Sequence, residues 1–178
     1  IVASGVNGNL RSDDQWLYFI NGANQQIDRI KTDAPALELD VKADGVEIVQ
    51  VVQSLNQDVK LVTGKPTFAR GYAHFVKNTT GKSDWLPSAA LRGFLNGVEL
   101  AGSPLAPLNS VNLDTTSDIN VLRNDLARSY LFRLPDSWVK NAGSLTVEFS
   151  VDPQAVLPET ASQADNKIGL KATATVVK

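Results

Sequence analysis

The sequence lacks the residues on which several kinds of site depend. It has no cysteine, no methionine and a single histidine, His74. Without cysteine there is no disulfide, no thiolate-bound zinc and no thiol nucleophile. One histidine cannot make the His-Glu-x-x-His motif of a zinc peptidase or any other site with two imidazoles. There is also no Gly-x-Ser-x-Gly turn and no phosphate-binding glycine loop, so no serine hydrolase or nucleotide site is indicated.

A bias toward one sign of charge and long apolar runs are also missing. The 17 basic and 19 acidic residues are mixed along the chain and give a net charge of −2. With no basic stripe, nucleic acid is not an expected partner. No apolar run approaches the ~18 residues of a membrane helix and no signal peptide is recognisable, so membrane insertion is not expected. The chain starts at Ile1 rather than methionine, which suggests a processed or excised piece of a longer protein or a cloned domain boundary.

The patterns that are present are mainly those of strands. Residues 145–152 and 168–177 alternate apolar and polar side chains, which is typical of antiparallel strands with one buried face. Residues 46–52 are rich in β-branched side chains and predict the opening strand of the same body. Residues 130–134 predict a further strand that ends at Pro135.

Turn signals connect these strands, and helix signals are few. Asn96-Gly97 lies between two short apolar runs, so residues 91–100 predict a hairpin. Only residues 118–129 have apolar side chains at helical spacing, enough for one short helix. Turn residues recur every ten to fifteen positions, which is typical of a β-sandwich or barrel.

The N-terminal part differs from the rest. Residues 15–30 predict a separate hairpin around Asn21-Gly22 and resemble the hairpin of a propeller blade. Two strands alone are marginally stable in water, so this piece is expected to dock on the main body or to be the remnant of an upstream repeat. We therefore predict an N-terminal hairpin or linker segment, residues 1–42, and a sandwich domain, residues 43–178.

Three segments carry a family resemblance. Residues 59–75 have a Gly-Lys-Pro turn before a strand, residues 91–105 hold the Asn-Gly hairpin, and residues 130–167 end a strand at Leu-Pro and pass through Val-Asp-Pro. Together they resemble the bacterial cell-adhesion-related (CARDB-like) modules, which are immunoglobulin-like antiparallel β-sandwiches of secreted multidomain proteins. The closing motif of that family is matched by Val151, Asp152, Pro153, Val156, Glu159 and Asn166.

The chain departs from the family pattern at two places. Ala69, Gly71 and Ala73 stand where the family usually has bulky inward side chains. Either the core is thin there, or the opposite face of that strand, with Phe68 and Tyr72, is the buried one. Asp165 replaces the first residue of an expected asparagine pair.

The resemblance implies a non-enzymatic extracellular adhesion, interaction or spacer module. Its expected partners are other domains of a parent protein and a surface polysaccharide or protein ligand, at the cell surface or outside the cell, with the periplasm as an alternative. Two other functions remain open: a carbohydrate-binding module, and an accessory domain of a metallopeptidase-containing protein.

The acidic residues are expected to be structural. Aspartates fit turns because their side chains bind nearby backbone amides, and this is the interpretation for Asp13, Asp14, Asp40, Asp44 and Asp84. His74 is expected to be a satisfied or surface side chain. No catalytic residue and no cofactor are predicted.

The loop from Asp152 to Asn166 is rich in oxygen ligands but does not have the spacing of an EF-hand. The prediction is a solvated loop in a domain that folds without metal, and calcium binding stays open as the alternative.

The three tryptophans bear on sugar binding, because exposed aromatic rings can stack on sugars. Trp138 is expected to be packed, and Trp16 to belong to a docking face of the first hairpin. Trp85, flanked by turn residues, is the candidate ligand contact, unless it tucks under its own loop.

Overall fold

The computed structural model describes residues 11–12, 16–20, 26–31, 38–52, 54–159, 164–167 and 170–178. The chain divides into two compact units, Ile1–Ala36 and Leu37–Lys178. The sequence suggested a boundary after residue 42, whereas this division comes after Ala36. Leu39 and Val41 are already buried in the core of the second unit. None of the helices in the described ranges has the length and hydropathy needed to cross a bilayer.

The first unit contains a three-stranded antiparallel sheet. Its strands are β1 (Arg11–Ser12), β2 (Trp16–Ile20) and β3 (Ile27–Lys31), in that order. The pairing of β2 with β3 confirms the predicted hairpin. The Asn21-Gly22 turn lies outside the described residues.

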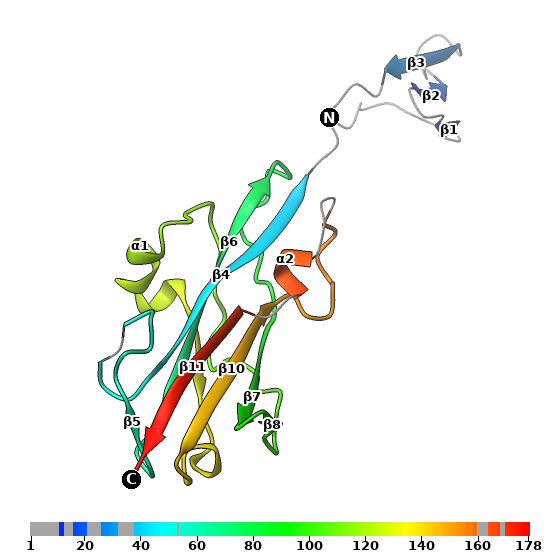
Figure 1. The fold of residues 1–178 in the computed structure, drawn as a ribbon. Coiled ribbons are helices and arrows are strands. Elements are labelled where there is room, and N and C mark those ends of the chain that lie inside the picture. Colours follow the sequence, from blue (N-terminus) through cyan, green and yellow to red (C-terminus); the bar gives the residue numbers. More distant parts are fainter. Residues whose placement is uncertain are drawn as a thin grey trace. The chain divides into compact units, whose positions relative to one another are not determined.

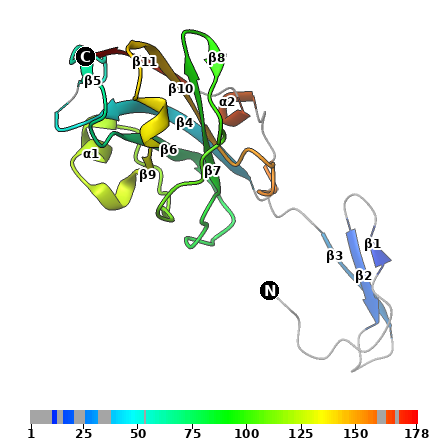
Figure 2. The same cartoon turned by 90° about the horizontal axis from the view of Figure 1, so that it is seen from below.

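The second unit is an immunoglobulin-like β-sandwich of two antiparallel sheets with one parallel edge pair (Figures 1 and 2). One sheet has the order β4-β6-β9 and the other the order β5-β11-β10-β7-β8. The strands are β4 (Leu39–Val49), β5 (Leu61–Val62), β6 (Phe68–Asn78), β7 (Ala89–Leu95), β8 (Val98–Glu99), β9 (Tyr130–Arg133), β10 (Gly143–Val151) and β11 (Leu170–Val177). The short helices are α1 (Ile119–Arg123), η1 (Leu126–Arg128), η2 (Asp136–Trp138) and α2 (Ala164–Lys167).

The alternating strands lie as the sequence predicts. On β10 the apolar set is fully buried, with 0% exposure at each of Leu145, Val147, Phe149 and Val151. The hairpin β7–β8 turns at Asn96 and Gly97, whose φ angles of 50° and 83° are those that an Asn-Gly turn supplies. The predicted short helix is present as α1 followed by η1.

The opening strand differs from its prediction. We expected residues 46–52, but β4 starts at Leu39 and ends at Val49, and Val51 is 90% exposed. The pairing of β4 with β6 shifts register at two points, between Asp40 and Val41 and between Ala43 and Gly45. The buried positions alternate through Leu39, Val41 and Ala43 and resume at Val46 and Ile48, so the second irregularity changes the phase and the two halves do not read as one strand.

Both faces of β6 are buried, which resolves the alternative left open by its small residues. Ala69, Gly71 and Ala73 line the inward face, while the outward side chain of Tyr72 is also 0% exposed. The ring of Phe149 fills the space above Gly71, where a Cβ atom would lie only 2.3 Å from the ring. The core there is therefore completed by the opposite sheet.

Substituting Gly71 with alanine should destabilise the sandwich by about 1–3 kcal/mol, because a well-packed core does not accommodate an added methyl group. The free energy of unfolding in urea measures this. The double variant Gly71→Ala/Phe149→Leu should recover part of the loss, since it removes ring atoms that the methyl group meets. Strictly additive losses would show that Phe149 is not the obstacle.

Candidate functional site

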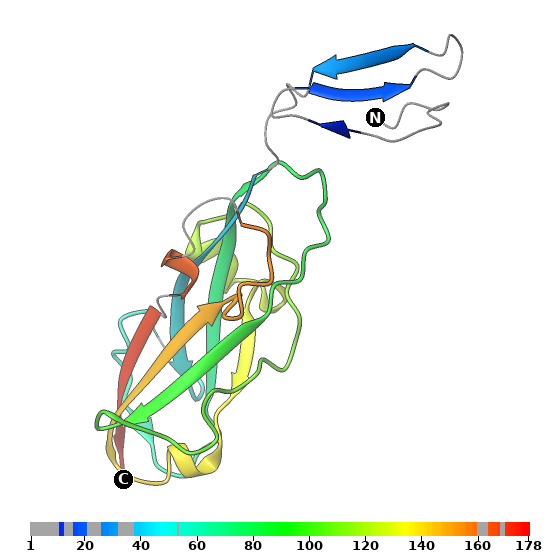
Figure 3. The ribbon, with the colours of Figure 1, turned by 90° about the vertical axis from the view of Figure 1, so that its right-hand side faces the viewer.

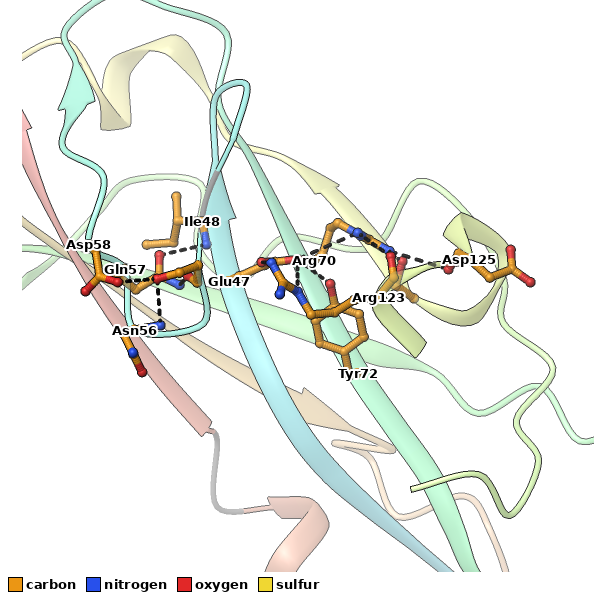
Figure 4. Close-up of polar contacts among 11 residues, drawn as sticks. Glu47, Ile48, Asn56, Gln57, Asp58, Arg70, Tyr72, Arg123 and Asp125 are labelled. Atoms are coloured by element: carbon orange, nitrogen blue, oxygen red, sulfur yellow. Dashed lines mark hydrogen bonds and ion pairs between the residues drawn. The ribbon is translucent and has the colours of Figure 1, made fainter. Parts of the chain in front are cut away.

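A buried polar cluster lies on the outer face of β4 and β6 (Figure 4). Its centre is the carboxylate of Glu47, which is 1% exposed. Tyr72 donates its hydroxyl proton to Glu47 Oε1, and Arg123 Nη2 donates to Oε2 at 2.9 Å. Arg70 Nη1 lies 3.6 Å from Oε1. A single carboxylate is thus shared by two guanidinium groups and a phenol.

The strand pattern explains why these side chains meet. Glu47 lies between the inward residues Val46 and Ile48, so it points to the opposite face, where Arg70 is its cross-strand partner. The chain segment of α1 covers this face, and Leu122 is buried beneath it.

Arg70 ties that segment to the sheet. Its Nη1 and Nη2 both donate to the carbonyl oxygen of Arg123 at 3.1 Å, and its Nε donates to Ser129 Oγ at 3.1 Å. Burial, followed by the hydrogen bond to Glu47, raises the pKa of Tyr72, and the bond to Glu47 raises the pKa of Arg123. Tyr72 and Arg123 therefore stay protonated at neutral pH. The cluster anchors the α1–η1 segment to the sheet.

His74 lies farther along the same face of β6 and is paired with Asp44. His74 Nδ1 and Asp44 Oδ2 are 2.7 Å apart, and their side chains are 11% and 10% exposed. Burial raises the pKa of Asp44, and the bond to His74 opposes this rise. Asp44 lies at the register shift of β4, thirty residues from His74 in sequence, so the sequence offered no signal for the pair.

The loop after β10 begins with an internal cap. Asp152 has a positive φ of 43° and is 1% exposed. Its carboxylate oxygens accept from the backbone amides of Val156 and Leu157, both at 3.0 Å. Asp152 therefore closes the first turn of the loop.

The other end of this loop joins α2. Asn166 is 0% exposed, and its Nδ2 donates to both carboxylate oxygens of Glu159, at 2.8 and 2.9 Å. Burial and the neighbouring charges of Asp152 and Asp40 raise the pKa of Glu159 to about 7, and the bond from Asn166 opposes this. The prediction of a wholly solvated loop is wrong for its two ends, because both are buried against the sandwich.

The remaining candidate acids do not share one environment. Asp40 and Asp44 lie within β4 rather than in turns, which corrects the sequence-based interpretation. Asp84 is exposed, with Lys82 Nζ at 3.8 Å. Asp13 and Asp14 fall outside the described residues. In the described part of the chain, no three His, Cys, Asp or Glu side chains form a group suited to a metal.

The tryptophans are engaged within the protein. Trp85 is half-buried against the core, its indole N–H donates to Thr80 Oγ1 at 3.2 Å, and the ammonium of Lys82 lies 4.4 Å from its ring centre. Trp138 is 1% exposed and donates to a backbone carbonyl at 2.9 Å. In the first unit, the guanidinium of Arg29 lies 4.3 Å from the ring centre of Trp16.

Comparison with known proteins found matches among solved structures alone. No protein-family model matches the chain, and no curated protein sequence is significantly similar to it. Among solved structures, a similar one is the CARDB domain of the PF1109 protein from Pyrococcus furiosus, determined in complex with di-metal ions. The two are 11% identical over 79% of this chain and 94% of that one, with a TM-score of 0.45. The CARDB domain is the class that the sequence motifs resemble, and a likeness of this size bears on neither ligand nor activity.

Replacing Glu47 with alanine should lower the free energy of unfolding by about 3–5 kcal/mol, because it leaves two arginines together without their buried partner. Urea unfolding measures the loss. Glu99→Ala is the matched control: Glu99 pairs with Arg92 at the surface, so the unfolding midpoint should hardly change. Equal losses in the two variants would contradict an anchoring role for Glu47.

Alkaline pH should weaken the fold through Tyr72. Its pKa is higher in the folded state than its ordinary value of 10.0, so its contribution is complete below that value and is lost as pH rises toward the folded pKa. We expect the free energy of unfolding to fall above about pH 10, and to fall less steeply in Tyr72→Phe. Urea titrations at a series of pH values test this, and identical slopes for the two proteins would contradict it.

Proposed function

We propose that this chain is a non-catalytic adhesion, interaction or spacer module of a larger secreted or surface-attached protein. The observation that supports the proposal is the course of the chain through the second unit. The chain enters β4 at one end of the sandwich and completes β11 at the other (Figure 3). Such a module adds length between whatever precedes it and whatever follows it.

The pairing of the strands establishes this course. The eleven residues of β4 span roughly 36 Å at about 3.3 Å per residue. Just past its end, the side chain of Gln50 bonds to both the N–H and the carbonyl of Val62, each at 2.8 Å. Val62 pairs with Val177, the last residue of β11. The end of β11 therefore lies at the far end of β4 from Leu39.

The reactive side chains of the sandwich also favour a structural role. His74 is bound to Asp44, and Glu47 is bound to two arginines and a tyrosine. These contacts join strands and the segment that covers them. The proposed partners are neighbouring domains of the parent protein and a surface polysaccharide or protein ligand. The proposed location at the cell surface or outside the cell follows the sequence resemblance.

A distance measurement tests the spacer geometry. Because the chain has no cysteine, Glu38→Cys/Lys178→Cys can carry two spin labels without background. Double electron–electron resonance between the two labels should give one narrow distance distribution at roughly 30–45 Å, as the length of β4 requires. The control pair is Glu38→Cys/Lys77→Cys, since these side chains form an ion pair at one end of the sandwich; its distance should be much shorter. A broad distribution or a similar distance for both pairs would contradict the proposal.

A glycan array separates the proposal from a carbohydrate-binding function. The wild type and Trp85→Ala, both checked for folding by circular dichroism, are compared on the array and on insoluble polysaccharides. Because Trp85 is engaged by Thr80 and Lys82, we expect no retention that depends on this ring. Retention by the wild type that is lost in a folded Trp85→Ala would replace the spacer function with sugar binding.

A further inference from the structure

Three side-chain oxygen atoms where α2 meets β4 are buried without a hydrogen-bond donor. They are Asp40 Oδ1, Asp165 Oδ1 and Asn166 Oδ1. The short helix α2 packs against β4 and β10, and the charges of Asp40 and Asp165 act on each other. Buried polar atoms normally have partners, since leaving one without a partner costs free energy comparable to a lost hydrogen bond.

Asn166 shows which kind of partner is missing. The nitrogen end of its amide donates to both oxygens of Glu159, which fixes the orientation of the group. The oxygen end is then left as an acceptor in a side chain that is 0% exposed. Rotating the amide would place its oxygen against the Glu159 carboxylate, so the protein itself cannot satisfy both ends.

The surrounding charge is mainly negative. Glu159 lies within electrostatic range of Asp152, Asp40 and Asp165, and Asp40 lies within range of Asp165. The carboxylate of Asp152 accepts hydrogen bonds from backbone amides. His74 and Lys42 act on Asp40 in the direction opposite to the negative charge of Asp165. Asp40, Glu159 and Asp165 are half-buried, so water screens their attraction for a nearby cation only in part.

We propose that Asp40, Asp165 and Asn166 bind one hard divalent cation through these three oxygen atoms, with calcium as the best fit. The set contains oxygen alone, in two carboxylates and one amide, which is the chemistry that calcium prefers. The proposed site has two acidic ligands and one amide, so it differs from a site built from three His, Cys, Asp or Glu side chains, of which the described residues contain none. Magnesium requires a stricter octahedral geometry, so we expect it to bind this site more weakly than calcium.

In this arrangement Glu159 is a positioning residue. It holds the amide of Asn166 so that the oxygen faces the cation, in the way that outer carboxylates orient ligands in other metal sites. The bound cation joins α2 to the beginning of β4. Three protein oxygens leave several of the six to eight coordination positions to water, so the dissociation constant should be about 10⁻⁴–10⁻³ M.

Calcium titration of the whole chain tests the site. After treatment with chelator and dialysis, 10 mM CaCl₂ should raise the melting temperature by about 3–10 °C, and isothermal titration calorimetry should give one site. Sodium chloride at matched ionic strength separates this from screening, and MgCl₂ should give a smaller shift.

Two isosteric variants locate the effect. Asp40→Asn and Asp165→Asn should melt at or above the wild-type temperature in chelator, because like-charge repulsion is relieved, and should lose the calcium shift. Asp136→Asn, a change at an exposed acid, should keep the shift. An absent calcium shift in the wild type, or an equal shift in Asp165→Asn, overturns the proposal.

Discussion

The approach of Phe149 to the backbone of Gly71 sets how closely the two sheets of the sandwich lie. The neighbours of Gly71 on the same face, Ala69 and Ala73, are also small. The β6 sheet is therefore low at this point, and Phe149 from the β10 sheet fills the space. Tyr130 and Phe132 pack around the same ring, with centroids 5.7 and 6.1 Å from it. Residues that look like a weak strand in sequence are therefore half of a close-packed contact.

The outer face of the smaller sheet depends on a different kind of contact. Gly45 leaves space there for Ile119, because a Cβ atom at Gly45 would lie 2.6 Å from the end of that side chain. The buried carboxylate of Glu47 then binds the segment through Arg123. The sheet thus carries a third layer, which is held both by the apolar contacts of Ile119 and Leu122 and by the charge network. Breaking such a network is costly, because it leaves a buried charge without its partner.

Much of the fold follows from local patterns, and little of the polar structure does. Alternation identifies β10, and the Asn96-Gly97 pair identifies the β7–β8 hairpin, because both signals are contained in a few consecutive residues. The start of β4 also alternates, but it does not read as one strand with residues 46–52 because the alternation changes phase at the register shift between Ala43 and Gly45. The cluster of Glu47 with Arg123 joins residues 76 positions apart, and pairing at that separation is decided by topology. The sequence shows that Asp152 and Asn166 carry oxygen ligands, but it does not show that both side chains are buried.

The parallel pairing of β5 with β11 has a mechanical consequence. These strands pair through Leu61 with Val176 and Val62 with Val177, and Thr63 N–H also donates to the carbonyl of Val177 at 2.8 Å. If the two ends of the sandwich were pulled apart, the load would run along these strands and strain their hydrogen bonds together. Opening a hairpin from its end, by contrast, breaks the bonds one after another. The short contact with β5 would then add to the resistance of the seven pairs that join β11 to β10.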